Sequence, residues 1–182
     1  MKRLLIGLLA ISVTLGGGLA TSAQDVADPT GSSVEGMRIS PLIDVDGNEV
    51  GLVAFGNDGE GVGGTIMVRG LAAGEHGIHL HGSGNCDPAG EKPFDSAGPH
   101  FNPEELLHGS HAGDIGNLIA DENGDAVFEL GSATWMLDDS THGLADSDGT
   151  ALVIHETVDD LVTDPSGNSG ARIACAVLFA SQ

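Results

Sequence analysis

The sequence predicts an all-β fold: an eight-stranded Greek-key β-sandwich or flattened barrel with two long functional loops. From Val34 onward, short apolar or alternating runs recur between glycine and Asp/Asn turn residues, and no stretch keeps a helical period for long. The 29 glycines fit many short strands joined by turns, which is typical of sandwiches and barrels. A chain of 182 residues, 40% of them hydrophobic, suffices for one domain with a core.

The strands follow one another along the chain as short runs separated by turn residues. Asp46-Gly47 follows the first run and Asn123-Gly124-Asp125 follows the fifth, and both sequences favour tight hairpin turns. In chain order, the predicted strands are Met37 to Asp44, Val50 to Phe55, Gly64 to Arg69, His76 to His81, Leu118 to Ala120, Ala126 to Leu130, Ala151 to His155 and Ala171 to Phe179.

Two stretches, residues 82–117 and 156–170, are too long and irregular to be ordinary hairpin connections. Long loops in a small domain are usually functional or disordered, and these two carry or adjoin most of the histidines. A third extended connection, residues 131–149, contains the only tryptophan, Trp135, and a cluster of aspartates. We expect Trp135 to pack in the core or against a loop, and a partner surface is the alternative.

The amino terminus has the three parts of a secretory signal peptide. Met1-Lys2-Arg3 is followed by an apolar run from Leu4 to Leu15 and then by small residues up to Ala23. We expect cleavage after Ala23 and export to the periplasm or the cell exterior, with no membrane attachment afterwards. A membrane anchor is the alternative, but the apolar run is shorter than the ~20 residues that span a bilayer. The predicted parts are a signal peptide, a disordered leader and one β-domain, at residues 1–23, 24–33 and 34–182.

The chain has two cysteines, Cys86 and Cys175. An oxidising compartment would let them persist as a disulfide, which would stabilise the fold by ~4 to 5 kcal/mol in the chain-entropy model. Two separate buried thiols or a Cys-His metal site are the alternatives. The bridge is favoured because export supports it and the histidines already supply enough ligands.

The net charge of −21 excludes some classes of partner. So acidic a surface repels nucleic acid and anionic membranes. It is compatible with adaptation to high salt, with solubility alone, or with a solvated surface that has no partner.

Six of the eight histidines fall where a two-metal site would need them. Imidazole suits copper and zinc, whereas calcium and magnesium prefer oxygen ligands. His79 and His81 are two apart in a predicted strand, so both rings leave the same face. Together with His155, at the end of another strand, they could hold one metal in planar nitrogen coordination, which favours copper.

A second group of candidate ligands lies in the first long loop. His100 is flanked by glycine and prolines that restrict its loop, and His108, His111 and Asp114 follow at short intervals. Three nitrogens and one carboxylate oxygen are a suitable tetrahedral set for zinc. Each histidine alone would more often be a surface residue, and only their joint occurrence predicts a site.

These motifs, in this order, resemble the copper/zinc superoxide dismutase family over roughly residues 37–178. That family has a β-sandwich architecture, so the resemblance and the fold prediction are not independent of each other. The matching segments are His79-Leu80-His81, Gly98-Pro99-His100-Phe101-Asn102-Pro103, His111-Ala112-Gly113-Asp114-Ile115-Gly116-Asn117, Leu152-Val153-Ile154-His155-Glu156 and Gly167-Asn168-Ser169-Gly170-Ala171-Arg172-Ile173-Ala174-Cys175.

The resemblance implies two ligand sets that share His100. The copper ligands would be His79, His81, His100 and His155. The zinc ligands would be His100, His108, His111 and Asp114. It also implies a Cys86–Cys175 disulfide, an arginine beside copper at Arg172, and a carboxylate at Asp159 that hydrogen-bonds one ligand from each metal.

The implied activity is the dismutation of superoxide to oxygen and hydrogen peroxide. Copper would cycle between two redox states, zinc would be structural, His100 would deliver a proton and Arg172 would orient the anion. A non-catalytic copper/zinc-binding module for buffering or delivery is the alternative, and an enzyme that works with copper alone is a third hypothesis. Superoxide is the expected small-molecule partner. The sequence is compatible with a homodimer but does not decide the oligomeric state.

Three features depart from the family pattern. His108 and His111 are only three residues apart, which shortens the zinc loop. The loop 156–170 contains no lysine, so we expect activity to rise or stay flat as ionic strength increases. The third departure is the extended connection 131–149. We assign no metal role to His142 within it, nor to His76.

Overall fold

The structure is a computed structural model that describes residues 36–57, 61–133, 135–138, 140 and 143–182. The signal peptide and leader expected before Val34 lie outside the described residues, as does His142. The description below concerns the unit Val34–Gln182. Within the described residues, no helical segment has the length and hydropathy needed to cross a bilayer.

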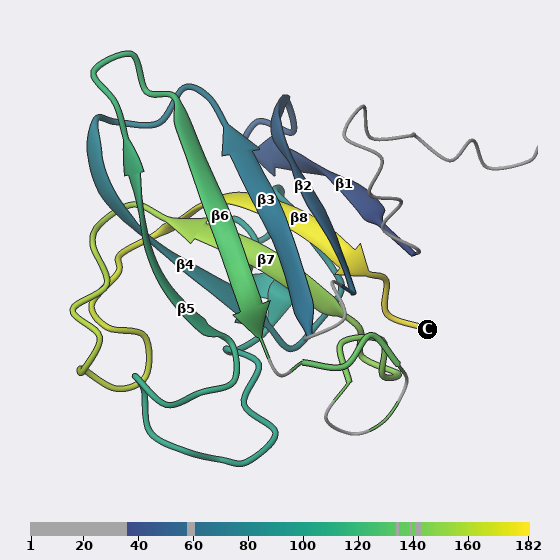
Figure 1. Ribbon diagram of the computed structural model, residues 1–182. Coiled ribbons are helices and arrows are strands. Elements are labelled where there is room, and N and C mark those ends of the chain that lie inside the picture. Colours follow the sequence, from purple (N-terminus) through teal and green to yellow (C-terminus); the bar gives the residue numbers. More distant parts are fainter. Residues whose placement is uncertain (1–35, 58–60, 134, 139, 141–142) are drawn as a thin grey trace, which may run out of the picture. The chain divides into compact units, whose positions relative to one another are not determined.

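Eight strands form one antiparallel sheet, which confirms the all-β prediction (Figure 1). The described residues hold one short helical turn, η1 (Asp95–Ala97). The strands are β1 (Arg38–Asp44), β2 (Glu49–Asn57), β3 (Val62–Val68), β4 (Gly74–His81), β5 (Asp114–Ala120), β6 (Ala126–Ala133), β7 (Thr150–His155) and β8 (Arg172–Phe179).

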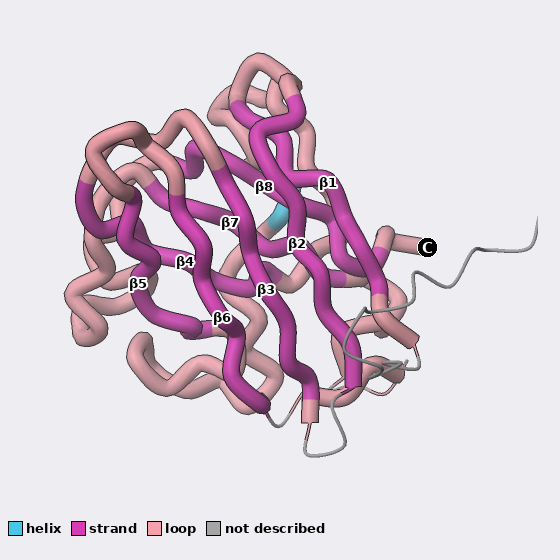
Figure 2. Tube along the Cα trace, turned by 45° about the horizontal axis from the view of Figure 1, so that its top comes forward, coloured by secondary structure: helices cyan, strands magenta, loops and turns pink. Residues whose placement is uncertain are grey.

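The strand order is β5-β4-β7-β8-β1-β2-β3-β6, and it divides into two four-stranded halves. The halves are joined by a short β1–β8 pairing, Ile43 with Cys175 and Asp44 with Ala174. The outer strands β5 and β6 contact each other without a hydrogen-bonded ladder, so the sheet folds into a flattened barrel (Figure 2). The β3–β4 and β6–β7 connections pass between the halves, which is the expected Greek-key connectivity.

The core lies between the two halves and is formed by alternate residues of the strands. On β2, Val53 and Phe55 point inward, where Leu42 of β1 and Ile66 of β3 are also buried. Side chains of a strand alternate between its two faces, so each strand contributes every second residue to this core. The aliphatic and aromatic content of these runs therefore drives closure of the barrel.

Strands β4 and β7 are buried on both faces, and this property places the histidines. Ile78 of β4 and Ile154 of β7 face the main core, whereas Val153 of β7 belongs to a second cluster with Phe94 and Cys175. His79 pairs with Val153 in the β4–β7 ladder, so its side chain leaves the outer face. The period of two puts His81 and His155 on that same outer face.

Most strand boundaries lie within two residues of the prediction, but β6 ends at Ala133 rather than at Leu130, and the start of β5 differs most. β5 begins at Asp114 rather than at Leu118, so the first long loop ends four residues earlier than expected. The segment from Asp114 to Asn117 contains Gly116, whose φ is 120°, and a register shift interrupts the β4–β5 ladder between Ile78 and His79. Because the pairing is irregular, apolar and polar residues do not alternate cleanly over this segment of the sequence.

Candidate metal centre

Four histidines converge beside the ends of β4 and β7. His79, His81 and His155 stand on the outer face of these strands, and an isolated antiparallel bridge between His81 and His100 brings the loop histidine against them. One ring nitrogen from each of the four lies within 4.8 Å of the others. All four side chains are buried, so little of their surface is exposed to water.

The hydrogen bonds of these rings leave one nitrogen free on each side chain. His79 Nε2 lies 2.8 Å from Asp159 Oδ2, and His81 Nδ1 lies 2.8 Å from the carbonyl oxygen of Gly98. A ring nitrogen that donates to an oxygen carries the proton, so the other nitrogen presents a lone pair. The buried nitrogens without a hydrogen-bond partner include His79 Nδ1, His81 Nε2, His100 Nε2 and His155 Nε2.

Burial keeps three of these imidazoles, those of His79, His81 and His155, neutral at physiological pH. Desolvation, followed by the nearby His100, lowers the pKa of His79 to about 4. Desolvation and the neighbouring His79 lower the pKa of His155 to about 3, and desolvation with the nearby Arg172 holds the pKa of His81 well below 6.5. Neutral rings with inward lone pairs are what a bound transition metal requires, and the four-nitrogen set fits copper.

The second group of candidate ligands has the dimensions of a tetrahedral zinc site. Asp114 Oδ1 lies 2.9 Å from His100 Nδ1, 3.3 Å from His108 Nδ1 and 3.2 Å from His111 Nδ1. The Nδ1 atoms of His100 and His111 are 3.4 Å apart. Four ligand atoms placed tetrahedrally about 2.0 to 2.1 Å from zinc lie roughly 3.3 Å from one another. The shortened loop between His108 and His111 therefore still brings the four predicted residues together.

Asp159 joins the two groups. Its Oδ2 accepts a hydrogen bond from His79 Nε2 at 2.8 Å, and its Oδ1 accepts one from His108 Nε2 at 2.9 Å. Burial raises the pKa of Asp159, but the hydrogen bonds from these two histidines outweigh burial and bring it below its ordinary value. An ionised carboxylate in this position fixes the orientation of one ring in each group.

Asn117 is a supporting residue that was not singled out from the sequence. Its side-chain amide donates to the carbonyl oxygen of Asp159 at 2.9 Å, and its Oδ1 accepts from the Asp159 N–H at 2.7 Å. Gly167 lies against the same carboxylate, where a Cβ would overlap Asp159 and the His108 ring. Neither residue has a sequence signal of its own, because both act through contacts that fold from distant parts of the chain.

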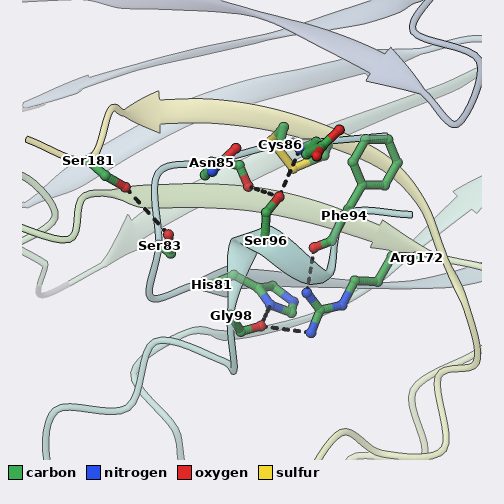
Figure 3. Close-up of a disulfide and its surroundings, with 11 residues drawn as sticks. His81, Ser83, Asn85, Cys86, Phe94, Ser96, Gly98, Arg172 and Ser181 are labelled. Atoms are coloured by element: carbon green, nitrogen blue, oxygen red, sulfur yellow. Dashed lines mark hydrogen bonds between the residues drawn. A yellow bond between two sulfur atoms is a disulfide. The ribbon is translucent and has the colours of Figure 1, made fainter. Parts of the chain in front are cut away.

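The histidines His79, His81, His100 and His155 form what we call the copper-side group. Arg172 is held by backbone carbonyls at the edge of this group, beside His81 (Figure 3). Its Nη1 donates to Phe94 O and its Nη2 to Gly98 O, each at 2.7 Å. Gly98 O also accepts from His81 Nδ1, so one carbonyl oxygen orients both a candidate ligand and the guanidinium. The guanidinium faces a cavity of about 1070 Å³, whose walls also include His81, His100 and His155.

The cavity contains charges of both signs. Lys92, from the loop that carries the disulfide, lines it together with Arg172, and the carboxylates of Asp95, Glu156 and Asp164 line it as well. The loop 156–170 contributes no lysine to the cavity, because its sequence has none. The contribution of Lys92 was missed because its place in the sequence does not reveal which loop faces the site.

The predicted disulfide is present between Cys86 and Cys175, with a Cα–Cα distance of 5.8 Å (Figure 3). It attaches the loop that follows β4 to strand β8. The carbonyls that hold Arg172 belong to that loop, and Cys175 packs with Phe94 in the second cluster. The disulfide therefore supports the segment that orients the arginine.

His76 and Trp135, which were singled out in the sequence without a metal role, both make structural contacts. His76 is buried, with ring nitrogens 2.8 Å from the carbonyl oxygens of His155 and Ala72. Trp135 packs against the main core, and its indole N–H donates to Ala112 O at 2.6 Å. The packing prediction for Trp135 is confirmed.

The fold and the site define a class of protein: an antiparallel β-barrel with two adjoining groups of metal-ligating side chains that have one histidine in common. Residues 49–178 match the family model for copper/zinc superoxide dismutase (SODC). The chain belongs to this family. It is therefore an oxidoreductase that acts on superoxide, with copper and zinc as its cofactors.

Relatives in several bacteria support this assignment. The chain is 32% identical over 189 residues to the Cu-Zn superoxide dismutase of Deinococcus radiodurans, covering 96% of this chain and 95% of that protein. It is 37% identical over 147 residues to the superoxide dismutase-like protein YojM of Bacillus subtilis, covering 76% and 74%. The crystal structure of a SOD-like protein from Bacillus subtilis superposes with a TM-score of 0.70 at 35% identity, covering 78% of this chain and 99% of that one.

Proposed function

We propose that this chain is an exported superoxide dismutase in which His100 bridges a redox-active copper and a structural zinc. The observation that carries the proposal is the position of the His100 ring. Its Nδ1 lies among the zinc-side ligand atoms, whereas its buried Nε2 has no hydrogen-bond partner and faces the copper-side group. A single ring with both nitrogens directed to ligand groups is suited to joining two metals.

When bound, copper would supply one-electron exchange, and zinc would supply a fixed positive charge without redox chemistry. The chain's own contribution at this point is a proton site. His100 Nε2 can hold a proton while Nδ1 keeps its place in the second group, and it can pass that proton to a reduced substrate. Two superoxide anions and two protons then give one oxygen and one hydrogen peroxide.

Arg172 binds and orients the substrate anion. Its guanidinium is pinned by Phe94 O and Gly98 O, so its position does not have to be fixed when the anion arrives. Arginine keeps its charge at any relevant pH, and its planar donors suit a small anion. The cavity in front of the guanidinium provides access to the copper-side histidines.

A non-catalytic metal-binding module is the second candidate function, and the name of the superoxide dismutase-like protein YojM favours testing it directly. A buffering or delivery site has no need of a pinned cation beside its ligands, so Arg172 supports the enzyme. The deciding experiment measures metal content and superoxide consumption on protein loaded with both ions. We expect two metals per chain and rapid dismutation. Copper-loaded protein without activity would support the second candidate, and an active protein without zinc would support an enzyme that works with copper alone.

Export is proposed from the amino-terminal sequence. Mass spectrometry of the protein recovered from the producing cells is expected to give a mature chain that begins at Gln24, outside the cytoplasm. A full-length chain retained inside the cell would contradict export. The same preparation, measured by light scattering, tests for the homodimer.

A further inference from the structure

The extended connection between β6 and β7 is attached to the barrel by its own hydrogen bonds and packing contacts. The N–H of Leu144 donates to Met136 O at 2.8 Å, and Leu144 itself is buried in the main core. Thr150, the first residue of β7, donates its hydroxyl to Leu144 O at 2.7 Å. Trp135 therefore projects from a base that is attached to the barrel, and that base also contacts the first long loop, where the Gly84 N–H donates to Asp148 O at 2.8 Å.

The indole of Trp135 reaches from this base to the loop that precedes β5. Its ring is partly buried against the main core, and its Nε1–H donates to Ala112 O at 2.6 Å. Ala112 lies between His111 and Asp114, two residues of the zinc-side group. The contact thus joins the third extended connection to the segment that holds half of that group.

Every carbonyl oxygen of this short segment has a specific donor. His111 O accepts from the Asp114 N–H at 3.1 Å within the turn, and Gly113 O accepts from the Leu80 N–H of β4 at 2.8 Å. Ala112 O accepts from Trp135. Strand β4, the indole and Phe101, whose carbonyl oxygen accepts from the Gly113 N–H at 2.8 Å, therefore hold the segment from outside.

We propose that Trp135 is a positioning residue for zinc: its indole N–H fixes the Ala112 carbonyl, and thereby the relative placement of His111 and Asp114. This role rests on the zinc set of the proposed function. Within the shortened loop, the N–H groups of Gly109 and His111 donate to Asp114 Oδ2 at 2.7 and 3.0 Å, so the loop braces its own ligands from inside. Trp135 adds a brace from outside the loop, through the β6–β7 connection.

The test compares two variants of the metal-loaded protein. Trp135→Phe keeps an aromatic ring against the core but removes the N–H. Leu137 is partly buried against the core, so Leu137→Ala removes packing from the same connection. This variant keeps the indole of Trp135. Zinc release to a colorimetric chelator should be about 3- to 10-fold faster in Trp135→Phe than in the wild type, as expected for the loss of one hydrogen bond. Leu137→Ala should release zinc at the wild-type rate, although its thermal midpoint falls, and copper content should be unchanged in both.

A second readout uses the fact that Trp135 is the only tryptophan of the chain. Removing zinc from the wild-type protein should shift its emission to longer wavelength as the Ala112 contact loosens. Equal zinc release in Trp135→Phe and wild type would overturn the positioning role, as would equally fast release in Leu137→Ala. Unchanged emission on zinc removal would also count against it. A wild-type chain that takes up no zinc at all would refute the zinc set itself.

Discussion

The carboxylate of Asp159 accepts hydrogen bonds from two histidines, so Asp159→Asn should disturb the metal centre with little change in volume. Oδ1 accepts from His108 Nε2 at 2.9 Å and also from the Leu161 N–H at 2.7 Å, while Oδ2 accepts from His79 Nε2 at 2.8 Å. An asparagine has one carbonyl oxygen, so its NH₂ group must face one of the donors. One imidazole then loses its acceptor or changes its tautomer.

The zinc side should lose more affinity than the copper side. His79 is held by strand β4, which pairs with β5 and β7 along its length, whereas His108 lies on irregular chain between strands. Loss of such an outer partner costs about 10- to 100-fold in metal affinity, or roughly 1.4 to 2.7 kcal/mol. Zinc affinity of Asp159→Asn should fall by this factor.

The assay is competition with a chelator of known zinc affinity, followed by metal analysis of the recovered protein. Glu156→Gln is the matched control, since it removes the same charge from the same loop at an exposed side chain. It should bind zinc as the wild type does. If Asp159→Asn matched the wild type and Glu156→Gln in zinc affinity, the idea that this carboxylate orients the ligands would be wrong.

Three further predictions concern the substrate anion, the surface charge and the buried histidines. Arg172→Leu should keep both metals and lose about 10- to 100-fold in superoxide turnover, because a charge-assisted contact to the anion is removed; metal analysis and a superoxide assay test this. Turnover of the wild type should rise or stay flat as salt is added from low ionic strength, since the net charge of −21 repels the substrate and salt screens it. In metal-free protein, His79 and His155 have pKa values of about 4 and 3 against an ordinary value of 6.5. The unfolded chain binds more protons between these values, so the free energy of unfolding should fall as pH is lowered from 6.5 towards 4, as measured by denaturant titration.

Each of these predictions has an outcome that contradicts it. Full turnover in Arg172→Leu would remove the guanidinium from the reaction. A steep loss of activity with added salt would mean that the local cations, Lys92 and Arg172, outweigh the charge of the whole chain. A metal-free protein equally stable at both ends of the pH range would show that the buried histidines are not neutral in the folded state.

The strands were largely predictable because their residues alternate. The run from Val50 to Phe55 contains a core residue at every second position in its second half, and β2 extends only slightly beyond it. The start of β5 was not predictable, because Asp114 to Asn117 pairs through an irregular register that local sequence does not encode. Secondary structure set by side-chain period is visible in the sequence, and structure set by a partner strand is not.

The ligand groups were also predictable, but not from each residue alone. His79 and His81 reveal their shared face through their spacing, whereas His108 and Asp114 were placed in one tetrahedral set by the joint occurrence of candidate ligands in the first long loop, and resemblance to a family implied the same set. Asn117 and Lys92 were missed, since an amide that holds a backbone and a lysine that faces a cavity have no spacing rule. Their roles exist only after the loops have folded over the sheet.

The two ligand groups rest on supports of different rigidity. His79, His81 and His155 stand on paired strands whose opposite faces are packed into the main core, so moving them requires disrupting the barrel. His108 and His111 stand on loop segments held by a few hydrogen bonds, among them those from Asp159 and Trp135. Regions with fewer buried contacts open at lower free energy than strands in the core. Local opening should therefore release the zinc-side ligands while the copper-side histidines keep their places. The redox chemistry would then take place on the rigid, copper side of the centre, and the zinc side would be the part whose support can adjust.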